Sequence, residues 1–150
     1  PNHIDYEEMQ AYADVLLSAV KNARLLVATF QSSVFASLLS ALLVAVSRFS
    51  TEGGDPMDAA FAVKKDALAR TAAKIIQIMN TDDSFSKTVP FVMSNCLMSA
   101  SPSIQHSLLL LSQHLDQFGR AMLATGLPPT ERLAYQRLFP YFKQANRMVA

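Results

Sequence analysis

Apolar residues recur at helical spacing along most of the chain, and one stretch differs because it has almost no polar positions. Val34–Val46 spans thirteen residues without a charge, a glycine or a proline. A helix that is apolar nearly all round is either buried in a protein or spans a membrane, and a membrane span needs about 20 apolar residues. Since Ser47 and Arg48 end the run, we predict the buried central helix of a helical bundle.

Five further helices are expected from apolar positions three and four residues apart and from the turn residues between them. Pro90 and Pro140 fall inside two of these helices, so we expect a kink or a late start near Thr88 and a bend in the last helix. A sustained two-residue alternation, which would predict strands, is absent from the sequence. The predicted helices cover about residues 5–30, 33–49, 55–79, 84–100, 103–125 and 130–149.

The boundaries follow from caps and turns. Asp55-Pro56 after Gly53-Gly54 has the order of an N-cap followed by proline at the first helical position, and Gly126 suits a C-terminal cap. Residues 31–33 are either a short turn, capped by Ser32 or Ser33, or the interior of one long helix; we favour the turn. The prediction is an all-α fold, a compact bundle of five to six helices in a single domain covering residues 1–150.

Composition narrows the class of protein. Apolar residues make up 51% and charged residues 17%, with a formal net charge of +1; this favours a packed core and argues against nucleic acid as a partner. Cys96 is expected to be a small buried hydrophobic residue, or, if exposed, to form an intermolecular disulfide. The chain opens PNHIDYEE, which is unlike a signal peptide, and its first residue is proline. We therefore expect a domain excised from a longer protein.

The titratable residues of the chain do not match a known catalytic pattern. His106 and His114 are eight residues apart, about 12 Å along a helix, whereas a shared metal ion is usually held by ligands one turn apart. The sequence contains no G-x-S-x-G element and no phosphate-binding glycine loop. The acidic pairs Glu7-Glu8 and Asp82-Asp83 suit helix starts. We predict no catalytic residue, no cofactor and no metal ion, and hence a non-enzymatic protein.

Four short motifs occur in a fixed order along the first half of the chain. They are Tyr6-Glu7-Glu8-Met9, the run Val34–Val46, Glu52-Gly53-Gly54 and Ala62-Val63-Lys64. This order resembles the N-terminal domains of spider silk proteins (spidroins). The segments Gln117–Gly119 and Ala124–Leu127, followed by a helix to Phe142, resemble the helical repeat units of spidroins, with a pyriform-type repeat fitting best.

This resemblance implies a secreted structural domain that keeps a fibre protein soluble and supports its self-association. It also implies that Glu7, Glu8, Asp82 and Asp83 tune association with pH, although capping explains the same residues. The alternative is a cytoplasmic or viral interaction module that holds a partner helix in a groove; it would make contact through Tyr135, Phe139, Tyr141 and Phe142. Both hypotheses involve protein partners, and neither involves a membrane.

Overall fold

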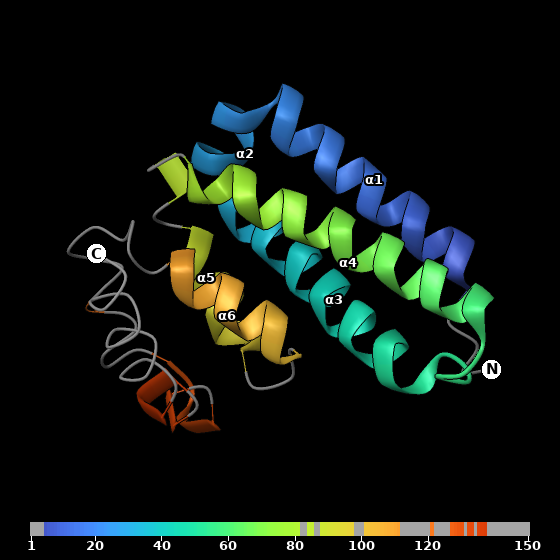
Figure 1. Ribbon diagram of the computed structural model, residues 1–150. Helices are drawn as coiled ribbons and strands as arrows, with labels where there is room; N and C mark the ends of the chain where they lie inside the picture. The colour runs from blue at the N-terminus through green and yellow to red at the C-terminus, as the bar shows by residue number, and fades with distance from the viewer. Residues whose placement is uncertain are drawn as a thin grey trace.

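The fold is all-α in the part of the chain that the computed structural model describes, namely residues 5–81, 84–85, 88–97, 101–111, 121, 127–130, 132–133 and 135–137. These residues contain no β-strand. They form a helical bundle (Figure 1), as predicted. Its helices are α1 (Tyr6–Asn22), α2 (Arg24–Thr29), α3 (Ser32–Glu52), α4 (Ala59–Asn80), α5 (Thr88–Cys96) and α6 (Pro102–Leu111).

The first predicted helix, over residues 5–30, is in fact two helices. Asp5 caps α1 by accepting a hydrogen bond from the backbone N–H of Glu7 at 2.9 Å. The chain then leaves helical geometry at Ala23, where φ is −128° and ψ is 34°, and α2 follows directly. Neither glycine nor proline marks this break, so the spacing of apolar residues predicted one continuous helix instead of two.

The helix α3 is longer than the predicted span 33–49. It begins after a turn at Phe30 and Gln31, which confirms the predicted break, but its N-cap is Gln31 and not a serine. At the other end, Ser50 donates its hydroxyl hydrogen to the carbonyl of Val46 at 2.9 Å, and Thr51 donates to that of Arg48 at 3.1 Å. Such back-bonding lets serine and threonine stay helical where the sequence suggested a loop.

The turn between α3 and α4 packs tightly against aromatic rings. The rings of Phe49 and Phe61 lie 5.3 Å apart, and a Cβ added to Gly54 would lie 2.7 Å from Phe61, which explains the glycine. The predicted cap Asp55 instead closes a turn with the N–H of Met57 at 2.9 Å. Asp58 caps α4 through the N–H of Ala60 at 3.0 Å, so α4 begins three residues later than predicted.

The helices α5 and α6 begin as the prolines predict. α5 starts at Thr88, which puts Pro90 in the first turn, where its missing N–H costs no helical bond. α6 starts at Pro102, and the N–H of Ser101 donates to Oγ of Ser47 at 2.9 Å, which ties this turn to α3. The predicted continuation to residue 125, the Gly126 cap and the bend at Pro140 lie outside the described residues.

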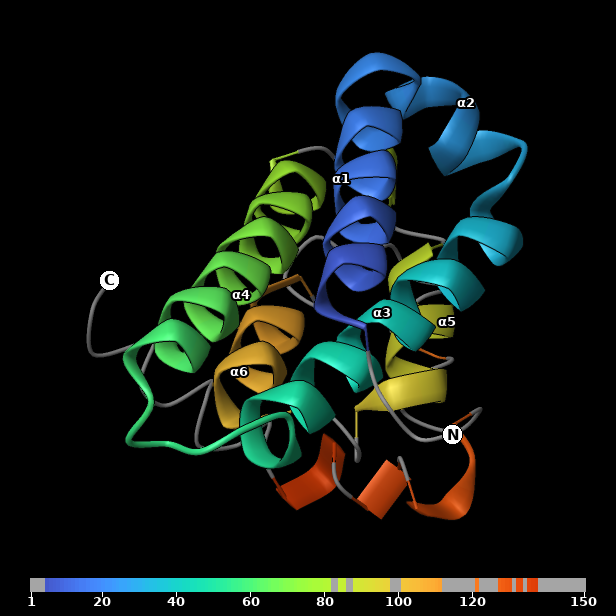
Figure 2. The same ribbon diagram turned by 90° about the vertical axis from the view of Figure 1, so that its right-hand side faces the viewer.

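The core surrounds α3, which packs against α1, α4 and α5 (Figures 1 and 2). Cys96 belongs to this core, as predicted, and is fully buried. The prediction of a buried central helix is only partly right, because one side of α3 is open. By length and composition α3 is also the one described helix able to cross a membrane, with half of that stretch buried. Its buried apolar residues are Phe35, Ala36, Leu39, Leu42, Leu43, Val46 and Phe49.

Candidate association surface

The open side of α3 is a stripe of seven residues at three- and four-residue spacing, which we call the outer face of α3. Side chains at such spacing lie on one side of a helix. Val34 and Leu38 are 57% and 40% exposed, and toward the other end the side chains become small, with Val44 and Ala45 half-buried. Its members are Val34, Ser37, Leu38, Ala41, Val44, Ala45 and Arg48.

Three bulky apolar side chains are exposed on the short helix α2 and on its C-cap residue. Leu25 is 69% exposed, Leu26 is 47% exposed and Phe30 is 81% exposed; we call them the α2 knob. The helix α2 has only six residues, and it is fixed to the core by Val27 and Ala28, which are buried. A helix of fewer than two turns has few neighbours to cover all its sides, and its remaining large side chains face solvent.

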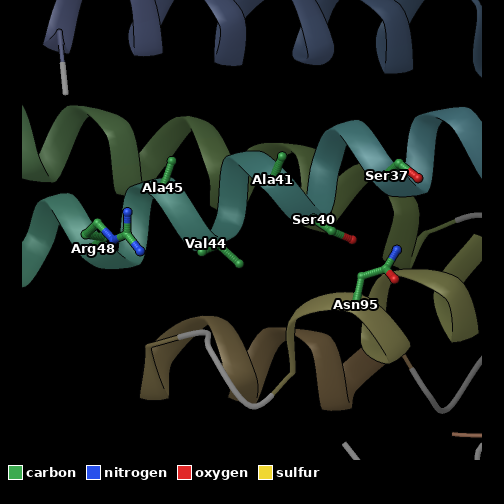
Figure 3. Close-up of a pocket in the computed structure, with 7 residues that line it drawn as sticks. All are labelled: Ser37, Ser40, Ala41, Val44, Ala45, Arg48 and Asn95. Carbon is green, nitrogen blue, oxygen red and sulfur yellow. The ribbon is translucent and has the colours of Figure 1, made fainter. Parts of the chain in front are cut away.

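A groove of about 570 Å³ runs along α3 beside α5 (Figure 3). Small side chains line it, so the surface is hollow where larger residues would have filled it. The hydroxyl of Ser40 donates to the carbonyl of Ala36 at 2.6 Å, and this polar group is therefore satisfied within the helix. The lining residues are Ser37, Ser40, Ala41, Val44, Ala45, Arg48 and Asn95.

Charge is almost absent from this side of the chain. No acidic residue occurs between Asp14 and Glu52, and no charged residue of either sign between Arg24 and Arg48. Arg48 lies at one end of the groove, is exposed and forms no ion pair with any described residue. The knob and most of the groove can therefore approach another uncharged surface without repulsion.

The acidic residues predicted to tune association lie elsewhere or outside the described residues. Glu7 and Glu8 are exposed in the first turn of α1, where Asp5 performs the capping. Glu7 borders a second hollow, of about 350 Å³, at the α3–α4 turn. Asp5 and Asp58 also line this hollow, and their carboxylates already accept the capping hydrogen bonds of α1 and α4. Asp82 and Asp83 are not among the described residues.

The aromatic residues predicted to contact a partner are described only in part. Tyr135 is half-buried against the core, and burial raises the pKa of its hydroxyl above 10.0. Phe139, Tyr141 and Phe142 lie outside the described residues. The sequence prediction therefore missed the outer face of α3. The sequence does show small residues at helical spacing along this face. However, when a helix is apolar on every side, the sequence does not indicate which side stays exposed.

Metal ligation and thiol chemistry find little support in the described residues. Among them no group of three or more histidine, cysteine or acidic side chains is placed to hold a metal ion. The thiol of Cys96 is buried and donates to the carbonyl of Val92 at 3.2 Å. Comparison of the chain with protein-family models, with curated proteins and with solved structures finds no match.

Proposed function

We propose that this chain is a non-catalytic helical domain that acts by associating with other copies of itself, as part of a secreted, silk-like fibre protein. One observation carries the proposal: large apolar side chains are exposed on the α2 knob and again at the start of the outer face of α3. Phe30 precedes α3 by two residues, and Val34 and Leu38 are exposed further along the helix. Exposed apolar side chains that gather into a patch mark protein contact sites.

The distribution of charge supports a second copy as the partner. In a two-fold contact the same patch faces itself, so a charged patch would oppose like charges, whereas from Leu25 to Ser47 this part of the chain carries no charge and the nearest charges are Arg24 and Arg48. Charged side chains are instead exposed on α4, at Lys64, Asp66, Arg70 and Lys74. Such a division keeps the free domain soluble while one side remains available for assembly.

A second candidate function is the binding of a helix from an unrelated protein, and the groove beside α5 favours it. Grooves lined by small residues admit the ridge of another helix at close distance. From Ser37 to Arg48 the groove follows about three turns of α3, or about 17 Å at 1.5 Å per residue. That length suits a short amphipathic helix from a partner.

The test is the association state of the protein by sedimentation velocity over a range of concentrations. Val34→Asp places a charge in the middle of the apolar surface, and we expect it to weaken self-association by about 10-fold or more, as for a central contact residue. Val63→Asp is the matched control, since Val63 is 65% exposed on α4. A wild-type protein that stays monomeric at every concentration contradicts self-association and favours the second candidate.

A further inference from the structure

Bulky apolar side chains are exposed at the end of the bundle where α1 stops and α3 begins (Figure 2). The α2 knob lies at this end, and Phe30 is the most exposed aromatic side chain among the described residues. Leu26 and Phe30 are four residues apart in helical backbone, so they lie on the same side of α2. Because Val27 and Ala28 are buried in the core, the knob is presented to solvent at a fixed position.

Two cationic side chains accompany the knob. Lys21 lies in the last turn of α1 and Arg24 is the first residue of α2, and both are exposed. Acidic residues are missing from the whole stretch between Asp14 and Glu52, and the acidic pair Asp82-Asp83 lies outside the described residues. In the described part of the chain, this end therefore combines exposed apolar side chains with positive charge.

The opposite end of the bundle is acidic. The start of α1 and the α3–α4 turn meet there, since both line the hollow of about 350 Å³. Arg48, Lys64 and Lys65 supply positive charge near this end, but a larger number of exposed carboxylates surrounds them. These carboxylates belong to Asp5, Glu7, Glu8, Glu52, Asp55 and Asp58. Among the described residues, the domain is thus electrically polar along its length, with the positive end at α2.

We infer that the α2 end of the bundle binds the surface of an anionic phospholipid bilayer. The leucines and the phenylalanine of the knob enter the boundary between headgroups and acyl chains, while Lys21 and Arg24 face the lipid phosphates. Interfacial helices that carry Phe and Leu on one face and cations on the other bind in this way, to a depth of about 5–10 Å. The inference is independent of the proposed self-association, and it departs from the sequence-based expectation that no membrane is a partner.

Charge and contact area both favour a lipid surface over a protein for the knob. The field of a negatively charged bilayer attracts the positive end of the domain and repels the acidic end, so it orients α2 toward the lipid. Three side chains bury far less than the roughly 800 Å² per partner of a stable protein interface. A bilayer needs no complementary surface, because acyl chains rearrange around an inserted side chain. Such binding is weak and reversible, comparable with that of a single acyl chain.

The experiment is co-sedimentation of the protein with vesicles of phosphatidylcholine, either pure or mixed with phosphatidylserine. We expect wild type to bind the mixed vesicles more tightly than the pure ones. Phe30→Ser should weaken binding by about 10-fold or more, because a large apolar side chain no longer leaves water. Met57→Ser is the matched control, since Met57 is 89% exposed in the α3–α4 turn at the acidic end; it should leave binding unchanged.

A second pair of variants tests the role of charge. Lys21→Gln combined with Arg24→Gln should weaken binding to the mixed vesicles by about 5-fold for each cation removed. Arg48→Gln combined with Lys64→Gln removes the same charge near the acidic end and should have little effect. The 21 residues of α3 separate the two ends by about 31 Å, well beyond the Debye length of about 10 Å at 0.1 M salt.

Circular dichroism checks that every variant is folded, and Leu25→Ser replaces Phe30→Ser if the latter is not. Wild type that fails to bind the mixed vesicles overturns the inference, as do equal losses in Phe30→Ser and Met57→Ser. Equal binding to pure and mixed vesicles contradicts the recognition of anionic lipid. Self-association without vesicle binding overturns this inference alone, whereas vesicle binding by a protein that stays monomeric supports it and contradicts the proposed function.

Discussion

The two sides of α3 are both largely apolar, but their environments are opposite. On the inner side Leu39 and Leu43 are fully buried, whereas on the outer side Val34 and Leu38 are 57% and 40% exposed. The difference comes from the neighbours: α1, α4 and α5 pack against α3, and among the described residues no helix covers the stripe from Val34 to Arg48. Composition therefore makes a helix apolar, and tertiary packing decides which of its sides becomes core.

The largest effect is expected on the inner side. Leu43→Ala removes a fully buried side chain and leaves a cavity among α3 and its neighbours, so we expect unfolding to become easier by about 2–5 kcal/mol. Urea denaturation at low protein concentration measures this change. Leu38→Ala is the matched control, since the same substitution at a 40% exposed position should cost clearly less. Equal losses at the two positions would contradict the contrast between the sides.

Much of the fold follows from local signals that the sequence carries openly. The apolar run Val34–Val46 predicted the central helix, Pro90 predicted either a kink or the late start that α5 has, and the burial of Cys96 follows from its apolar neighbours. These features depend on residues close in sequence. The capping signals were weaker guides, because Asp55 and Asp58 are equally good caps by residue type; in the structure Asp55 closes a turn and Asp58 caps α4.

The candidate site was not predictable in the same way. The open side of α3 is defined by which helices lie beside it, and the break at Ala23 that exposes Leu25 and Phe30 has no glycine or proline to announce it. The acidic pairs were instead predicted to tune association, because titratable residues are easy to recognise in a sequence. The exposed apolar surface consists of residue types that usually form cores, so sequence alone assigned it to the core.

A smaller effect is expected where α1 seals the edge of the outer face. The hydroxyl of Tyr12 donates to the backbone carbonyl of Leu38 at 2.7 Å. Tyr12→Phe removes this bond, and we expect a loss of about 0.5–1.5 kcal/mol in the free energy of unfolding at pH 7. Tyr6→Phe should cost less, because the Tyr6 hydroxyl makes only a 3.4 Å contact with Gln10. An unchanged stability in Tyr12→Phe would show that the edge does not depend on this bond.

The same residue gives a pH dependence of known sign. Burial raises the pKa of the Tyr12 hydroxyl above 10.0. Because the folded-state value is the higher one, the stabilisation is complete below pH 10 and is lost as the pH rises through the folded-state pKa. The stability difference between wild type and Tyr12→Phe should therefore shrink above pH 10. Denaturation series at pH 7 and above pH 10 measure it, and a difference that grows at alkaline pH would contradict this sign.

The smallest effect on the folded monomer is expected from Val34→Ser. Val34 is already 57% exposed, and surface substitutions of this kind change stability by about 0.5 kcal/mol or less. Its influence should appear only through association. A partner that binds the folded state alone raises the melting temperature as concentration rises, so the wild-type melting temperature should increase with concentration and that of Val34→Ser should stay nearly constant. Identical behaviour of the two proteins at all concentrations would mean that the outer face of α3 is merely exposed, and that its difference from the inner face has no functional consequence.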